Sequence, residues 1–201
     1  MDDCDLKRYQ DLFMLKFIQQ EIPSGSKILE VGGGDSRILR HLSGKYECWN
    51  IDKFAGNGNG PTQVPQVDYR IVVDYMGSFN EELPDGYFDL VFSISALEHL
   101  PWGDAKIYNN VINDINRVLK IGCYSLHLMD FVLGVSENPF FKFIFNNQKC
   151  LNRYMSYECM FNDQDIYYMS ENVYNKSWIH ITKKSYAQFG KPSSYNILWV
   201  K

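Results

Sequence analysis

Apolar runs alternate with amphipathic segments along the first 130 residues of this chain. The run at 88–94 is apolar at most positions, as expected for a strand that is covered on both faces of a sheet. Residues 104–119 instead place Ile107, Val111 and Ile115 at helical spacing. In chain order, the predicted strands are 27–31, 46–51, 69–73, 88–94 and 123–129, and the predicted helices are 6–22, 35–42 and 104–119. Such alternation is typical of a parallel, doubly wound sheet.

The first helix and the last 70 residues complete the predicted fold. The helix at 6–22 is expected to bury Leu12, Leu15 and Ile18, and Pro23 ends it. Beyond residue 130 the pattern predicts one helix and two strands, at 140–151, 177–181 and 195–200. The two strands would close the sheet as an antiparallel hairpin. The chain shows no linker, and its 201 residues fit one domain.

Three glycines join the first predicted strand to the helix after it, in the stretch Lys-Ile-Leu-Glu-Val-Gly-Gly-Gly-Asp-Ser at 27–36. Glycine allows positive φ and a close approach of the backbone to a ligand. The second strand ends at Asp52, whose carboxylate can accept hydrogen bonds from both hydroxyls of a ribose. Ligands of open parallel sheets bind beyond the carboxyl ends of the strands. The order therefore predicts a site for an adenosine-containing cofactor.

Taken together, five segments resemble the class I S-adenosylmethionine-dependent methyltransferases, of the methyltransferase-11-like small-molecule type. The segments are 28–36, 50–52, 72–74, 83–101 and 115–122. The resemblance implies a Rossmann-like, doubly wound α/β sheet of seven strands, parallel with an antiparallel last strand and with helices on both faces. The expected parts of the single domain are an N-terminal helix (1–26), a cofactor-binding core (27–130) and a substrate-side segment with the closing hairpin (131–201).

The resemblance implies S-adenosyl-L-methionine as the cofactor and gives roles to the matching positions. Glu30 would orient the glycine turn, Asp52 would bind the ribose and Asp74 the adenine amine. The expected cofactor-binding residues are Glu30, Gly32, Gly33, Gly34, Asp52, Asp74, Tyr75, Met76 and Ser93. Asp74 has a second interpretation, as the cap of a following helix, and Asp35 is interpreted as a helix N-cap.

Methyl transfer depends mainly on the alignment of nucleophile, methyl group and sulfur, and an oxygen or nitrogen nucleophile also uses a general base. The candidate bases are Asp130, His127 and His99, of which Asp130 aligns best with a polar residue of the relatives. A buried, hydrogen-bonded histidine is the alternative for His99. Some relatives bind a metal through a Glu-His pair and a further acid, but Ser95 occupies the acid's position here, so no metal is expected.

Composition narrows the substrate class. The net charge of −4 disfavours a nucleic-acid partner. Residues 170–201 carry five lysines against Glu171, a net +4, which suits an anionic acceptor or simply a solvated surface. Scattered cysteines, an acidic N-terminus and the lack of a long apolar segment favour a cytoplasmic location without a membrane span. We therefore expect a small-molecule acceptor, methylated at an oxygen of a sugar or nucleotide-sugar-like group. The oligomeric state stays open, with a homodimer as one option.

Two other functions are compatible with parts of the pattern. An NAD-dependent oxidoreductase would carry a third glycine, but Arg37 occupies that position, and the acid closing the third strand has no role there. A non-catalytic subunit that binds S-adenosylmethionine would keep the same cofactor motifs. All of these motifs are intact in the sequence, as an active enzyme also requires.

Overall fold

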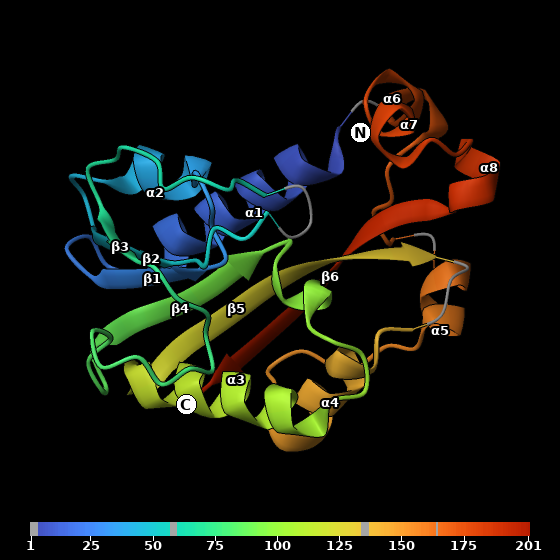
Figure 1. Ribbon diagram of the computed structural model, residues 1–201. Helices are drawn as coiled ribbons and strands as arrows, with labels where there is room; N and C mark the ends of the chain where they lie inside the picture. Colours follow the sequence, from blue (N-terminus) through green and yellow to red (C-terminus); the bar gives the residue numbers. More distant parts are fainter. Residues whose placement is uncertain (1–3, 57–59, 134–136, 164) are drawn as a thin grey trace.

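The computed structural model describes residues 4–56, 60–133, 137–163 and 165–201, which form an α/β sheet flanked by helices (Figure 1). Within these residues the sheet has six strands in the order β3-β2-β1-β4-β5-β6. Strands β1 to β5 pair in parallel, and β6 runs antiparallel to β5. The strands are β1 (Lys27–Val31), β2 (Glu47–Ile51), β3 (Arg70–Val72), β4 (Phe88–Ile94), β5 (Leu119–Leu133) and β6 (Lys191–Val200).

Helices cover both faces of the sheet. Helices α1 (Leu6–Glu21) and α2 (Arg37–Leu42) lie on one face, and α3 (Ala105–Val118) and α4 (Pro139–Asn147) on the other (Figure 1). Leu90 of β4 belongs to the core under α1 and α2, whereas Val91 belongs to the core under α3 and α4. Strand β4 is therefore buried on both faces, which explains its nearly continuous apolar sequence. The Rossmann-like α/β class is confirmed.

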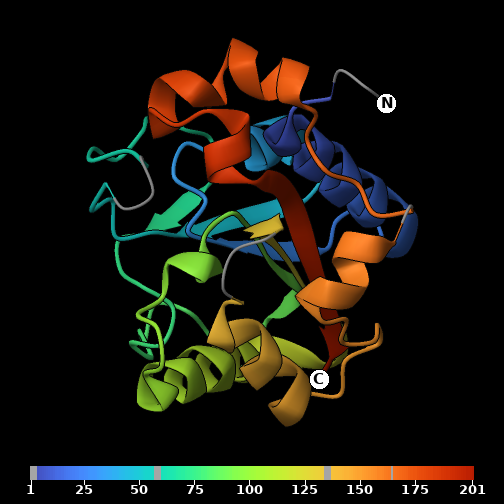
Figure 2. The ribbon, with the colours of Figure 1, turned by 90° about the vertical axis from the view of Figure 1, so that its right-hand side faces the viewer.

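The C-terminal third contains short helices, namely α5 (Tyr157–Asn162), α6 (Glu171–Lys176), α7 (Trp178–Thr182) and α8 (Tyr186–Phe189). Earlier in the chain, the 3-10 turn η2 (Leu97–His99) follows β4. Helices α6 to α8 gather near the start of α1 (Figures 1 and 2). There Leu6 packs against Met169, Val173 and Tyr174 in a small core of its own. No helix in the described part of the chain is long and apolar enough to cross a membrane.

The predicted count of seven strands is wrong, because the described residues form six. The segment predicted as a strand at 177–181 is helix α7, and none of the residues of α7 is buried. Trp, Ile, His and Ile in succession imitate the alternation of a strand. However, β-propensity acts only where a pleated, half-buried surface receives the side chains. Strand β6 therefore forms the edge of the sheet, and the predicted hairpin is absent from the described residues.

Two helices differ from their prediction in detail. Helix α1 buries Leu6, Gln10, Met14 and Ile18, whereas Leu12 is 64% exposed. These buried residues are spaced four apart, and they are the ones that face the sheet beneath the helix. The predicted helix at 140–151 ends at Asn147.

The N-cap of α2 is Ser36 and not Asp35. The Ser36 hydroxyl accepts from the N–H of Leu39 (3.0 Å), and α2 begins at Arg37. Asp35 instead pairs with Arg40 (2.6 Å). A serine N-cap satisfies one of the free N–H groups of the first turn. The prediction for Asp35 was therefore wrong by one position.

Candidate functional site

The glycine turn at 32–34 lies where the carboxyl ends of β1, β2 and β4 meet, and β2 fastens it. The side chain of Asn50 accepts from the N–H of Gly33 (3.1 Å) and donates to the carbonyl of Gly34 (3.0 Å). The N–H of Gly34 donates to Asp52 Oδ2 (2.8 Å). Because β1 is paired with β2 on one side and β4 on the other, the turn lies at the point where the strand order reverses. Ligands of open α/β sheets bind at this point.

Glycine is required in the turn by conformation and by space. Gly32 and Gly34 have φ of +69° and +54°, values that side chains disfavour. A Cβ on Gly32 would lie 2.6 Å from the Cβ of Ala96, which follows β4. A Cβ on Gly33 would lie 2.7 Å from the Glu30 side chain. The turn therefore packs directly on its neighbours and leaves its backbone free of side chains.

Glu30 is buried at the end of β1, and the hydroxyl of Ser36 donates a hydrogen bond to its carboxylate. Burial raises the pKa of Glu30 to about 7, although the hydrogen bond from Ser36 works in the opposite direction. Ser36 also caps α2, so one hydroxyl joins the strand, the turn and the helix. Glu30 thus lies under the turn with Ser36 as its described partner. The side chains that hydrogen-bond the turn itself are those of Asn50 and Asp52, so the expected orienting role of Glu30 stays a prediction.

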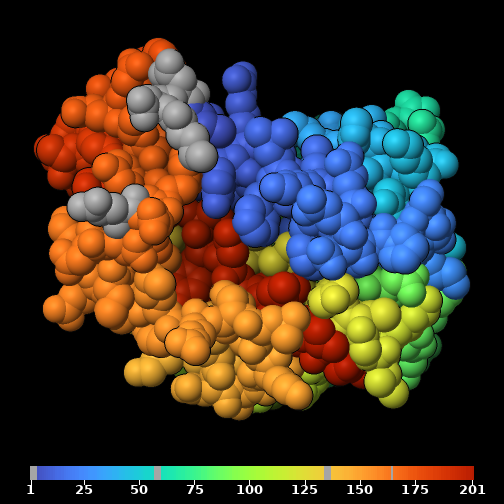
Figure 3. Space-filling model, turned by 180° about the vertical axis from the view of Figure 1, so that it is seen from behind, coloured from blue at the N-terminus to red at the C-terminus, as the bar shows by residue number. Residues whose placement is uncertain are grey.

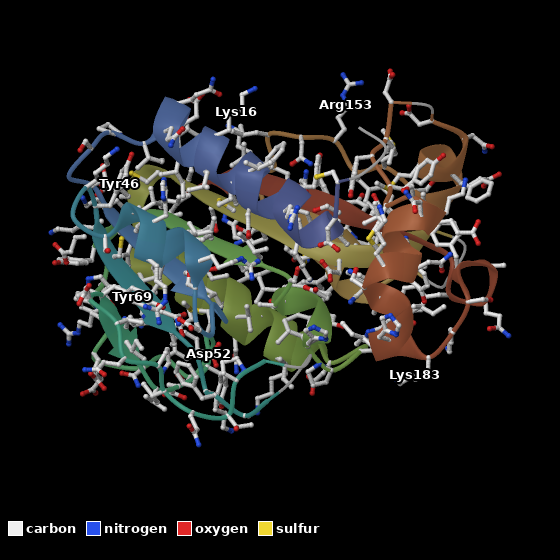
Figure 4. The ribbon with its side chains drawn as sticks, turned by 90° about the horizontal axis from the view of Figure 1, so that it is seen from above. Lys16, Tyr46, Asp52, Tyr69, Arg153 and Lys183 are labelled. Atoms are coloured by element: carbon white, nitrogen blue, oxygen red, sulfur yellow. The ribbon has the colours of Figure 1, made fainter. Side chains whose placement is uncertain are left out.

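Asp52 follows β2, and both of its carboxylate oxygens accept backbone hydrogen bonds. Oδ2 accepts from Gly34 (2.8 Å) and Oδ1 from Phe54 (2.6 Å). Since a carboxylate has about four acceptor positions, two remain for a ligand. Pro61, from the loop after β2, lies close to Gly34, only 2.9 Å from the place of an added Cβ. Figure 4 shows Asp52 on the same side of the molecule as Tyr69 and far from Lys183.

Asp74, after β3, accepts from the N–H of Tyr75 (2.8 Å) and from the side chain of Asn80 (2.9 Å). Burial alone would raise its pKa, but these hydrogen bonds outweigh it and hold the pKa of Asp74 below its usual value. No described helix begins here, so the alternative interpretation of Asp74 as a helix cap is wrong. Tyr75 is 55% exposed beside it, with Lys53 Nζ 5.4 Å from the ring centre. Met76, in contrast, is buried in the core under α3.

Ser93 and His127 form a buried polar chain between β4 and β5. Ser93 Oγ lies 2.8 Å from His127 Nδ1, and Ser125 Oγ lies 2.8 Å from His127 Nε2. The imidazole also packs on Trp199, with ring centres 4.8 Å apart. Burial lowers the pKa of His127 to about 3. The imidazole of His127 is therefore neutral and fully buried in the sheet, and this geometry argues against its expected role as a base.

Asp130, at the carboxyl end of β5, binds three side chains. Lys7 Nζ lies 2.5 Å from Asp130 Oδ2, and Gln10 Nε2 (2.9 Å) and Ser95 Oγ (2.6 Å) donate to Oδ1. Lys7 also donates to Ser95. Its ammonium group lies 5.8 Å from the ring centre of Trp178 in α7. The first turn of α1 is thus held across the ends of β4 and β5.

Glu98 and His99 of η2 lie beside this cluster. The N–H of Asp130 donates to Glu98 Oε1 (3.2 Å), whereas the buried Oε2 has no partner among the described residues. Burial, with the Asp130 charge second, raises the pKa of Glu98 to about 8. The His99 side chain is 46% exposed, and its Nε2 lies 3.9 Å from Glu98 Oε1. Partial burial is the main reason that the pKa of His99 is lower than usual.

The sequence analysis assigned no role at this site to three polar residues, namely Lys7, Gln10 and Asn50. Lys7 and Gln10 come from a helix more than 100 residues before Asp130, and their contacts with it depend wholly on the tertiary fold. Asn50 carried a visible signal, because it precedes Asp52 at the end of a predicted strand. An amide there can bind both the N–H and the C=O of a turn.

Comparison with protein families matches residues 29–126 to the model described as a methyltransferase domain. This segment runs from β1 into β5 and contains the glycine turn and both strand-end acids. No curated protein sequence matches the chain.

Solved structures of low sequence identity share the fold. A phosphoethanolamine N-methyltransferase 2 of Haemonchus contortus, with S-adenosylhomocysteine, has a TM-score of 0.57 and 17% identity over 96% of this chain and 52% of its own. A TehB-like SAM-dependent methyltransferase of Corynebacterium glutamicum has a TM-score of 0.54 and 17% identity over 96% of this chain and 94% of its own. A geranyl diphosphate C-methyltransferase of Streptomyces coelicolor has a TM-score of 0.55 and 10% identity over 96% of this chain and 76% of its own.

The chain spans about half the length of the Haemonchus protein. Because the sequence identities are low, these structures show a shared fold alone. The model of the methyltransferase domain thus matches residues 29–126, and the chain has the fold of the methyltransferases named above.

Proposed function

We propose that this protein transfers the methyl group of S-adenosyl-L-methionine to a small-molecule acceptor. The main support is the glycine turn, at which neither Gly32 nor Gly33 has room for a Cβ. Such a turn lets a ligand approach the backbone closely. Asp52 follows β2, the strand paired with β1, and Asp74 follows β3, the next strand outward. This arrangement favours a nucleoside with two ribose hydroxyls and an exocyclic amine.

The residues present fit the cofactor. Asp52 would accept from the ribose hydroxyls with the two acceptor positions that Gly34 and Phe54 leave open. Asp74 would accept from the adenine amine, with the exposed ring of Tyr75 beside it. Ser93, at the end of β4, would offer its backbone carbonyl to the methionine ammonium. When bound, the cofactor supplies an electrophilic methyl group on a sulfonium, so the protein mainly aligns the reactants.

For the acceptor we propose an oxygen nucleophile, on a sugar or a nucleotide-sugar-like molecule. Asp130 is the base that the geometry favours, because its carboxylate is partly exposed (23%) at the end of β5 and is positioned by Lys7, Gln10 and Ser95. His99 is the second candidate. Its lowered pKa leaves a half-exposed imidazole neutral near pH 7, and a neutral imidazole can take a proton.

The proposal of an anionic acceptor depends on the lysines of the C-terminal segment. Lys183 ends α7 in a left-handed conformation and Lys184 follows it, both exposed. Helix α7, which these lysines follow, lies beyond the carboxyl end of β5 and the start of β6, near the start of α1 (Figures 1 and 2). A cytoplasmic location, a homodimer and the division of the domain at residues 26 and 130 stay predictions.

Calorimetric titration with S-adenosylhomocysteine tests the proposed cofactor site. The unchanged protein should bind it with micromolar affinity and should not bind NAD. Asp52→Ala should weaken binding at least about tenfold, because hydrogen bonds to a charged group contribute about 1.5–3 kcal/mol. Asp68→Ala, at an exposed acid before β3, is the matched control and should bind normally. Equal affinity in both variants would rule out the ribose assignment.

A further inference from the structure

The outer side of the edge strand β6 is covered at two places in the described part of the chain. Near its end, Leu151 N–H donates to the carbonyl of Leu198 (2.8 Å), and the Asn152 side chain binds Leu198 N–H (3.0 Å) and the Asn196 carbonyl (2.7 Å). Near its start, Met169 N–H donates to the Pro192 carbonyl (2.8 Å). The two segments that cover the edge are therefore residues 151–152 and 167–169, and we call them the two covers.

Between the two covers, the backbone of Ser194 faces outward. Successive residues of an antiparallel strand direct their N–H and C=O to opposite sides. Since Pro192, Asn196 and Leu198 bond outward, Ser194 does so as well. Neither backbone group of Ser194 has an outward hydrogen-bond partner among the described residues. Such an uncovered edge is a template for a further hydrogen-bonding partner.

A cavity of about 250 Å³ opens at this gap. Seen from behind, β6 forms the floor of a hollow between α1 and the segment at 140–165 (Figure 3). The cavity is lined by polar groups of β6, by aromatic and apolar side chains and by two charged side chains, among them Ser194, Asn196, Tyr9, Tyr167, Arg153 and Asp165. Tyr9 and Tyr167 stack on each other at 4.1 Å with an angle of 9°. The volume is below the usual 300–1,000 Å³ of a drug-sized site, so it suits a single substituted ring.

The shape and the hydrogen-bonding groups restrict the ligand. A peptide strand cannot continue along β6, because residues 151–152 and 167–169 close the edge on both sides. The adjacent N–H and C=O of Ser194 match a group that presents an acceptor next to a donor. In a flat ring this group is a cyclic amide or imide, as in the C=O and N–H edge of uracil and thymine. We propose that this cavity binds a pyrimidine imide ring, at a site separate from the glycine turn.

A hydrogen-bond chain connects the cavity to the carboxyl end of β5. Ser194 Oγ donates to Asn196 Oδ1 (2.7 Å) and accepts from Gln10 Nε2 (3.2 Å). The same Gln10 nitrogen donates to Asp130 Oδ1 (2.9 Å), and Gln10 is fully buried. A ring held on Ser194 is therefore one side chain away from Asp130. The inference stands on this edge alone and does not require the proposed cofactor.

Backbone amide NMR shifts during titration of the full chain with uridine test the site. Uridine should shift the amide signals of Ser194 and Asn196 and saturate. The ligand 3-methyluridine lacks the imide N–H and should bind about tenfold more weakly, the effect of one hydrogen bond. Equal binding of the two ligands, or no binding of uridine, would overturn the proposal.

Two variants test the protein side. Ser194→Pro removes the outward N–H, and proline is tolerated at this position of an edge strand. It should weaken uridine binding about tenfold. Ser194→Ala keeps both backbone groups and is the matched control, expected to bind uridine like the unchanged chain. Titration of each variant with S-adenosylhomocysteine reports separately on the glycine turn, so failure of one site is distinguishable from failure of the other. Shifts confined to the glycine turn on addition of uridine would also contradict the proposal.

Discussion

Residues 27–130 and 131–201 belong to one sheet but are specified in different ways. In the first region, strands β1 to β4 fill the sheet centre and a parallel edge, and their ends carry the glycine turn and the acids Asp52 and Asp74. In the second, a single strand, β6, joins the sheet, and the other elements are short helices. The first region is determined by burial on both faces and by hydrogen bonds to a turn. The second depends on contacts with α1, which lies far away in the sequence.

The largest effect is expected from a substitution in the glycine turn. Gly32→Ala places a Cβ 2.6 Å from the Cβ of Ala96 at a φ of +69°. We expect the free energy of unfolding to fall by about 3–4 kcal/mol and S-adenosylhomocysteine binding to be lost. Gly86→Ala has a similar φ of +56° with nothing within 4 Å, and should cost only about 1–2 kcal/mol. Denaturant unfolding measures both, and equal losses would show that packing against Ala96 is unimportant.

The second effect concerns the buried polar chain between β4 and β5 in the first region. His127→Leu leaves the buried hydroxyls of Ser93 and Ser125 without their partner, and should destabilise the fold by about 2–3 kcal/mol. His41→Leu, at an exposed histidine, is the control and should change little.

The pH dependence of the same variant sharpens this test. The folded state keeps His127 neutral down to about pH 3, whereas the unfolded chain takes up a proton near pH 6.5. Unfolding therefore binds a proton in this window, and stability should fall as the pH decreases, by up to about 1.4 kcal/mol per pH unit. Unfolding curves at a series of pH values should show a weaker dependence in His127→Leu. An unchanged slope would place the titrating group elsewhere.

Glu98 should respond to pH with the opposite sign. Its pKa of about 8 means that the folded state holds a proton that the unfolded chain releases above its ordinary value of 4.5. The stabilising contribution of neutral Glu98 is complete below pH 4.5 and is lost as the pH rises through 8. Glu98→Gln should therefore be more stable than the unchanged protein at pH 8, by about 1–2 kcal/mol. Glu81→Gln, at an exposed acid, should have no such effect. A Glu98→Gln protein that is less stable at pH 8 would contradict the raised pKa.

The smallest expected effect tests the corrected C-terminal segment. Ile181 in α7 is 64% exposed, so Ile181→Ala should change stability by no more than about 0.5 kcal/mol. Ile197→Ala, at a fully buried position of β6, should cost about 2–4 kcal/mol. If thermal unfolding showed comparable losses of stability for the two variants, the original prediction of a strand at 177–181 would be supported.

The sequence predicted those parts whose signal is local. Strand β4 was predicted with its observed bounds, because burial on both faces leaves a run of apolar residues from Phe88 to Ile94. Helix α3 was predicted within one residue at each end, since Asp104 caps it and its apolar stripe is regular. Both signals lie within a single element.

The parts that failed depend on the tertiary structure. Residues 177–181 have the alternation of a strand but no place in the sheet, and the stripe of α1 is chosen by the surface beneath it. The ion pair of Lys7 with Asp130 joins the first helix to the carboxyl end of β5, across 123 residues of sequence. No short-range pattern reports such a contact, so the acceptor side of the site was the least predictable.

The contrast between the two regions is tested most directly by mapping the backbone amide NMR shifts caused by S-adenosylhomocysteine. The account predicts that the largest shifts fall on Gly32, Gly33, Gly34, Phe54 and Tyr75. The amides of Ser194 and Asn196, at the edge of β6, should stay nearly unchanged. Shifts concentrated at the β6 edge, with the glycine turn unaffected, would contradict the assignment of the cofactor site to the first region.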